Sequence, residues 1–174
     1  MGAIEINRIW AMPNKNTFQI KPVNDLINKY NKGNLYSIDP FANKSTLAWI
    51  TNDIDPQYST TFHKDALDFL KTFKDDCVDL VLYDPPFSPR QVSECYKKMN
   101  MTVNKETTQA SYWSKQKNEI ARIIKPNGLC ISCGWNSNGI GKTRGFEIIE
   151  ILLVAHGGNH NDTIITVERK TDGL

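Results

Sequence analysis

The feature that most constrains this chain is an apolar run, 78–83, that stops at Asp84-Pro85-Pro86-Phe87. Such a run predicts a buried strand. The strand ends there because two successive prolines lack the N–H groups of a sheet ladder and form a rigid turn. A carboxylate and an aromatic ring are therefore placed at the carboxyl edge of a sheet, where α/β proteins build their sites.

This tetrapeptide carries groups that suit a flat base with an exocyclic amine. The Asp84 carboxylate and a loop carbonyl can accept the two N–H bonds of the amine, and Phe87 can stack on the ring. An ordinary strand followed by a proline turn would show the same four residues. The order of the other segments has to decide between the two interpretations.

Helices and strands alternate along the rest of the chain. Periodicity and end signals predict helices over 22–30, 65–73 and 113–124, and strands over 34–39, 47–53 and 129–133. Two alternating apolar runs, 146–155 and 163–168, flank a glycine-rich connection and predict an antiparallel hairpin. The expected fold is α/β, with a mostly parallel sheet and an antiparallel hairpin at its C-terminal end.

Length and composition predict one domain over residues 1–174. The 174 residues, 40% of them hydrophobic, suffice for a single well-packed core. No apolar stretch reaches the roughly 18 to 20 residues that span a bilayer, and the first ten residues lack the plan of a signal peptide. We therefore expect a cytoplasmic protein without a membrane partner.

Four cysteines are spread among core-like segments, which fits a reducing compartment. Cys130 and Cys133 have the spacing of a redox or zinc site. No second Cys or His pair with ligand spacing accompanies them, and they lie in an apolar run. We expect two small strand residues and no metal.

Five short motifs occur in a fixed order, and each follows or precedes one of the expected elements. They are Phe18-Gln19-Ile20-Lys21-Pro22, Asp39-Pro40-Phe41-Ala42, Asn52-Asp53-Ile54-Asp55-Pro56, His63-Lys64-Asp65-Ala66-Leu67 and Asp84-Pro85-Pro86-Phe87. In this order the chain resembles small S-adenosylmethionine-dependent DNA adenine-N6 methyltransferases, the amino-methyltransferases of the compact kind common in phages and prophages. The resemblance implies a Rossmann-like methyltransferase sheet and a site-specific, adenine-specific enzyme in a bacterial or phage-infected cell.

The resemblance also implies a cofactor crevice for S-adenosyl-L-methionine at the ends of the first three strands. Backbone N–H groups after Asp39 and Pro40 would bind the methionine carboxylate, Asp53 the ribose hydroxyls, and Asp65 the adenine amine. A helix N-cap at Asp65 and a turn at Asp53 are the ordinary alternatives. The implied cofactor-binding residues are Phe18, Ile20, Lys21, Asp39, Pro40, Phe41, Ala42, Asp53, Ile54, Asp65 and Ala66.

The implied catalytic residues are Asp84, Pro85, Pro86 and Phe87. Asp84 and the Pro85 carbonyl would hold the two hydrogens of the target amine while Phe87 pins the base. A base in duplex DNA would have to be flipped out, so basic side chains should hold the phosphates. Residues 88–126 contain eight Lys or Arg against three Glu. The expected DNA-binding residues are Arg90, Lys97, Lys98, Lys142 and Arg144.

The aromatic residues Tyr96, Tyr112 and Trp113 could stack on bases, although core or helix packing is their ordinary role. A solvated helical face is the ordinary alternative for the basic residues as well. With no separate target-recognition domain, specificity is expected from residues 88–112 and 136–144, for a short sequence, or from a second subunit in a homodimer.

The chain departs from the family pattern after Phe41. The usual glycine-rich turn is absent, and five residues separate Phe41 from Leu47, too few for a helix. Either a shortened loop holds the cofactor, with residues 18–21 closing over it, or cofactor binding is weakened or lost. A nucleic-acid-binding protein without activity is therefore one alternative.

Two further alternatives concern the substrate. Ribosomal RNA guanine-N2 methyltransferases share the Asp/Asn-Pro-Pro-aromatic loop, and this chain's aspartate and short length favour DNA adenine. The segment 136–143 resembles a phosphate-binding P-loop because it ends in Gly-Lys-Thr, but Asn136 stands where the first glycine is needed.

Overall fold

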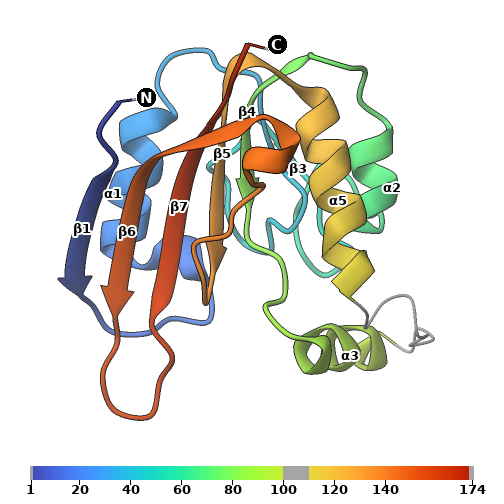
Figure 1. The fold of residues 1–174 in the computed structure, drawn as a ribbon. Helices are drawn as coiled ribbons and strands as arrows, with labels where there is room; N and C mark the ends of the chain where they lie inside the picture. The colour runs from blue at the N-terminus through green and yellow to red at the C-terminus, as the bar shows by residue number, and fades with distance from the viewer. Residues whose placement is uncertain (1, 100–109, 173–174) are drawn as a thin grey trace.

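The computed structural model describes residues 2–99 and 110–172, which form one seven-stranded sheet flanked by helices (Figure 1). The helices are α1 (Lys21–Tyr30), α2 (Ala66–Lys71), α3 (Pro89–Lys98) and α5 (Ala110–Ile123), with two 3₁₀ turns, η1 (Thr17–Gln19) and η2 (Lys142–Arg144). The strands are β1 (Glu5–Trp10), β2 (Ser37–Asp39), β3 (Ile50–Thr51), β4 (Val78–Tyr83), β5 (Ile124–Gly134), β6 (Phe146–Ala155) and β7 (Thr163–Lys170).

The strand order is β1-β6-β7-β5-β4-β2-β3, and β7 alone runs against its neighbours. β6 and β7 form the expected antiparallel hairpin, while β2, β3, β4 and β5 pair in parallel. This arrangement confirms the expected fold class. It also brings the carboxyl ends of β2, β3 and β4 to one edge of the sheet.

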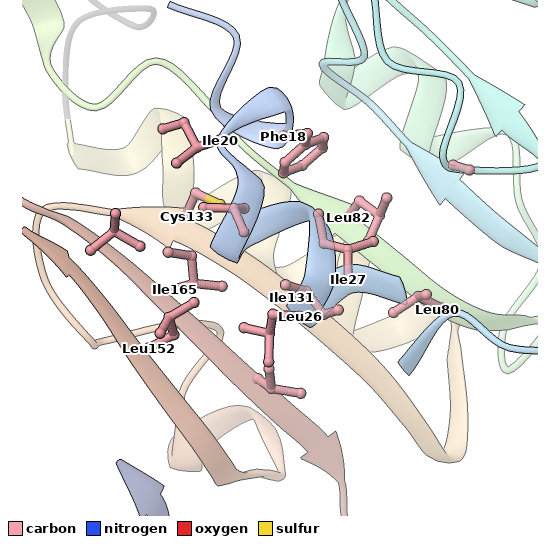
Figure 2. Close-up of a cluster of buried hydrophobic side chains, with 14 residues drawn as sticks. Phe18, Ile20, Leu26, Ile27, Leu80, Leu82, Ile131, Cys133, Leu152 and Ile165 are labelled. Carbon is pink, nitrogen blue, oxygen red and sulfur yellow. The ribbon is translucent and has the colours of Figure 1, made fainter. Parts of the chain in front are cut away.

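Helices cover the two faces of the sheet. α1 packs on one face, where Leu26 and Ile27 lie near Leu80 and Leu82 of β4 (Figure 2). α2 and α5 pack on the other face, against Val81 and Tyr83. From Leu80 to Tyr83, successive β4 residues alternate between the two clusters, because side chains of a strand point to opposite faces. This double burial explains why the run 78–83 is almost continuously apolar.

Two elements were not anticipated. β1 adds a parallel edge strand beside β6, and because its six residues are all exposed it carries no burial pattern to reveal it. α3 begins at Pro89, with the Ser88 hydroxyl accepting from the Gln91 N–H at 3.3 Å. A capping serine followed by proline is a helix start signal that the sequence contained.

The predicted strands over 34–39 and 47–53 are shorter in the structure, as β2 and β3. The predicted strand over 129–133 is longer, because β5 begins directly after α5. The helix predictions over 22–30, 65–73 and 113–124 are confirmed as α1, α2 and α5, within a few residues at each end. No helix in the described parts of the chain has the length and apolar character needed to cross a membrane.

Candidate active site

A pocket of about 600 Å³ opens at the carboxyl ends of β2, β3 and β4. Its walls come from the turn after β2, the start of the loop after β3, the start of α2, the loop after β4, one side of α3, and the segment 15–19 that precedes α1. Most of the predicted site residues line it: Phe18, Pro40, Phe41, Ala42, Asp53, Ile54, Asp65, Ala66, Asp84, Pro85, Pro86 and Phe87. Segments from distant parts of the chain thus converge on one cavity of ligand-binding size.

Asp84 follows β4 directly and lies on the pocket wall. Asp84 is partly exposed, but the surrounding protein shields its carboxylate from most of the solvent. This desolvation raises the pKa of Asp84 to about 6, and hydrogen bonding from the Thr17 side chain partly opposes the rise. Asp84 is therefore mostly ionised at neutral pH, and its pKa is close enough to neutral for it to bind and release a proton.

Phe87 stands three residues further along the same wall. Its ring is half-buried and meets the Trp135 ring edge-on, with centroids 5.7 Å apart. Its N–H donates to Gln91 Oε1 at 2.6 Å. The preceding carbonyl, that of Pro86, accepts from Trp113 Nε1 at 2.9 Å. The tetrapeptide Asp84-Pro85-Pro86-Phe87 is thus held by side chains of α3, of α5 and of the residue that follows β5.

The turn after β2 replaces the expected glycine-rich loop with a short loop stabilised by Asn43. Asn43 takes a φ of 51°, a left-handed conformation that asparagine tolerates better than most residues. The N–H groups of Phe41, Ala42 and Asn43 donate to Asp39 Oδ1, to the Asn52 carbonyl and to Asp53 Oδ2. The expectation that free N–H groups here receive a methionine carboxylate needs correction, because these N–H groups already have partners inside the chain.

Asp39 is fully buried at the end of β2 and does not line the pocket. Its Oδ2 has no partner among the described residues, and burial raises the pKa of its carboxyl well above the usual value. The nearby Asp84 charge adds to this rise. Asp39 therefore acts on the turn through its bond to the Phe41 N–H and makes no direct contribution to the pocket wall.

Asp53 lines the pocket and also organises the loops around it. Its two oxygens accept from the N–H groups of Asn43 and Asp55, each at 2.9 Å. Burial raises its pKa, and these two N–H bonds oppose the rise. Asp53 therefore has the turn-forming role that was its alternative, and it also lines the pocket.

Asp65 likewise forms local hydrogen bonds and lines the pocket. Its Oδ1 accepts from the Leu67 N–H at 2.9 Å, which makes it the N-cap of α2, and Oδ2 accepts from the Tyr96 hydroxyl at 2.7 Å. The residue also lines the pocket. Tyr96 is buried, and its hydroxyl holds α3 against the start of α2.

Besides Asp39, two more of the expected cofactor residues lie outside the pocket wall. Ile20 is buried in the cluster between α1 and the sheet, and Figure 2 shows it beside Cys133 and Phe18. The Lys21 ammonium pairs with Asp25 at 2.6 Å on the exposed side of α1. Neither residue lines the pocket.

Some of the predicted DNA-binding side chains are exposed, and others are bonded to groups of the protein. Lys98 lines the pocket, and Lys97 and Lys142 are exposed. Arg90 pairs with Glu94 at 2.8 Å on the surface of α3. Arg144 bonds to Asn118, Ser114 and the Ile140 carbonyl, so it fastens η2 to α5.

The excess of positive charge over 88–126 is partly compensated by ion pairs. Arg122 bonds to Glu119 and Asp75, and Lys125 bonds to Asp79 at 2.7 Å. Lys105 of this strip lies outside the described residues. A paired, solvated face accounts for much of the strip.

The P-loop alternative fails on hydrogen bonding. The N–H groups of Ile140 and Gly141 donate to the carboxylate of Glu168, at 2.6 and 2.9 Å. A side chain of the protein thus occupies the place where a phosphate would have to bind. The cysteines of the CxxC spacing belong to different clusters, Cys130 with α5 and Cys133 with α1, as the strand interpretation predicted.

Several residues that line the pocket were not predicted from the sequence. Lys15, Thr17, Asn43, Lys44 and Gln91 line the cavity. Thr17 adjoins the motif that begins at Phe18, and Gln91 follows the helix start at Ser88 and Pro89, so both carried a local signal. The inward position of the other three depends on how distant loops meet.

Comparison with solved structures shows the fold. The chain resembles 1,6-didemethyltoxoflavin-N1-methyltransferase from Burkholderia thailandensis, solved with S-adenosylhomocysteine, with a TM-score of 0.60, 10% identity and coverage of 87% of this chain and 78% of that one. N-methyltransferase NodS from Bradyrhizobium japonicum gives a TM-score of 0.56 at 10% identity, covering 92% and 100%. TrmN from Thermus thermophilus gives 0.58 at 15% identity, covering 87% of this chain and 49% of that one, so the chain spans about half of its length.

At these identities the likeness concerns architecture alone. No protein-family model matches the chain, and no curated protein matches its sequence. The structure therefore has a Rossmann-like methyltransferase fold, and its chemistry has to be argued from the pocket.

Proposed function

We propose that this chain transfers the methyl group of S-adenosyl-L-methionine to the exocyclic N6 amine of adenine in DNA. One observation carries the proposal: Asp84 and Phe87 line the same pocket as Asp53 and Asp65. An acceptor and a ring for the target base thus adjoin two carboxylates suited to a nucleoside. Asp84 lines this pocket and is only partly buried.

The pocket residues fit the cofactor. Asp65 would accept from the adenine amine and Asp53 from the ribose hydroxyls. Asn43 Oδ1 is buried on the pocket wall without a partner among the described residues, and it suits the N–H of an ammonium group. Because the N–H groups of Phe41, Ala42 and Asn43 are engaged, Lys15 and Lys44 would provide the positive charge for the methionine carboxylate. The bound cofactor supplies a methyl group on a positively charged sulfur.

The residues of the chain orient the target amine and accept the proton that it loses. Asp84 accepts one amine hydrogen and the Pro85 carbonyl the other, while Phe87 stacks on the base. The nitrogen that gains a methyl group must lose a proton. Asp84, with a pKa of about 6, is suited to receive it and pass it to solvent.

The choice of adenine in DNA rests on two supports. The first residue of the loop is an aspartate, and the chain resembles adenine-N6 enzymes over five co-linear motifs. Lys98 at the pocket, together with the exposed Lys97 and Lys142, would hold phosphates while the base is flipped.

The test is methyl transfer from labelled cofactor to separate DNA and RNA pools, followed by mass analysis of the nucleosides. N6-methyldeoxyadenosine is expected. N2-methylguanosine from RNA would favour the ribosomal alternative, and N4-methyldeoxycytidine would change the target base. Calorimetry should show micromolar cofactor binding, whereas no binding at millimolar cofactor would favour a protein without activity.

A matched pair of variants tests the site. Asp84→Asn should abolish transfer and leave cofactor affinity nearly unchanged. Asp68→Asn, on the exposed side of α2, is the control and should leave both unchanged. Equal loss of transfer and cofactor binding in Asp84→Asn would mean that the residue is structural.

A further inference from the structure

We propose that Trp113 and Gln91 are positioning residues that lock one peptide plane of the catalytic loop and thereby aim the Pro85 carbonyl. The inference rests on the proposed function, since it concerns how the loop meets the target amine. Neither residue belongs to the motifs that indicate the site. Gln91 comes from α3 and Trp113 from α5, the helices on either side of residues 100–109.

The two side chains grip the same peptide unit. Trp113 Nε1 donates to the Pro86 carbonyl at 2.9 Å, and Gln91 Oε1 accepts from the Phe87 N–H at 2.6 Å. These two backbone groups belong to one planar peptide and point in opposite directions. Holding both ends fixes the rotation of that plane, which is the ψ angle of Pro86.

The lock reaches Pro85 through proline geometry. The pyrrolidine ring of Pro86 fixes its φ near −65°, so once ψ is held both angles of the residue are set. The peptide plane that carries the Pro85 carbonyl is then fixed relative to the locked plane. The rigid loop therefore presents two acceptors to the pocket, the Asp84 carboxylate and the Pro85 carbonyl.

The same contacts remove competing groups. The two prolines have no N–H, the Phe87 N–H is taken by Gln91, and the Pro86 carbonyl is taken by Trp113. An NH₂ group has two hydrogens to donate. The Asp84 carboxylate and the Pro85 carbonyl are two acceptor groups of the loop that can receive them. Such a match suits a reaction that depends on how the amine lone pair is aimed.

Kinetics test Trp113. Trp113→Phe keeps an aromatic ring and removes the donor, so kcat should fall about tenfold while the KM for cofactor stays unchanged. Trp49→Phe is the matched control, because Trp49 is 68% exposed and does not line the pocket. A kcat of Trp113→Phe within twofold of the wild type would overturn the inference.

Gln91 allows a test that needs no activity. Gln91→Glu keeps the acceptor, and Gln91→Met has a similar length without it. Amide hydrogen exchange at Phe87 should stay slow in the wild type and in Gln91→Glu, and become at least tenfold faster in Gln91→Met. Equal protection in the methionine variant would contradict the lock.

The exchange experiment also separates this inference from the proposed function. If the wild-type protein transfers no methyl group to nucleic acid, the proposed function fails, and exchange at Phe87 still decides whether the lock exists. If Trp113→Phe does not fold, as judged by circular dichroism, the two Gln91 variants decide. In an active protein Gln91→Met should lose kcat, and Gln91→Glu should restore it.

Discussion

Thr17→Val should move the acidic limb of the pH–rate profile. In the wild type, burial raises the pKa of Asp84 to about 6. The Thr17 side chain has the opposite effect and lowers this pKa. The carboxylate is the form that accepts the amine hydrogen, so activity is present above pH 6 and is lost as pH falls through it. Removing the hydroxyl disfavours the charged form and raises the pKa further.

The size of the effect follows from the loss of the Thr17 hydroxyl, whose interaction with the charged carboxylate lowers the pKa of Asp84. A hydrogen bond to a charged group contributes about 1.5 kcal/mol, and about 1.4 kcal/mol corresponds to one pH unit, so the limb should move from about 6 to about 7. At pH 6 the ionised fraction would fall from about one half to about one tenth, a loss of rate of about fivefold. At pH 9 the two proteins should be nearly equal.

The assay is methyl transfer from labelled cofactor between pH 5 and 9, with both substrates below their KM values, because kcat/KM reports groups of the free enzyme. Thr17→Ser keeps a hydroxyl and is the control, which should retain the wild-type profile. A Thr17→Val profile that is lowered equally at every pH, with no shift of the limb, would refute the reasoning. Such a result would mean that Thr17 shapes the pocket without acting on the Asp84 charge.

Three further outcomes follow from the contacts. Asp65→Asn should weaken cofactor binding about tenfold by calorimetry, since one acceptor oxygen is lost, while Asp68→Asn should not. Gly139→Ala should lower the urea midpoint of unfolding for two reasons. The added Cβ would overlap the Glu168 carboxylate, and the φ of 50° at this position is unfavourable for alanine. Leu80→Ala should reduce the free energy of unfolding by about 2–5 kcal/mol in the same assay, because the side chain is fully buried between α1 and the sheet.

The sequence predicted those elements whose burial or strand pairing leaves a regular pattern of apolar residues. The run that ends at Asp84 and the alternation after Phe146 predicted β4 and the β6–β7 hairpin, because their patterns follow from being covered on two faces or paired in a ladder. β1 was missed because an exposed edge strand has no such pattern. The motifs gave the strand ends that meet at the pocket, while the partners of Phe87 and Pro86 came from helices whose docking no local pattern specifies.

The pocket walls are joined by the buried side chain of Asn52, the first residue of the motif that contains Asp53. β2 and β3 pair over only two residues, too few to fix the loops beyond them. Asn52 adds what the ladder lacks: its Nδ2 donates to the carbonyls of Pro40 and Lys64, and its Oδ1 accepts from the Lys64 N–H. The turn after β2 and the approach to α2 are thereby held to the end of β3. Because this amide is fully buried and satisfied, it can replace strand length and keep the pocket open although the glycine-rich turn is absent.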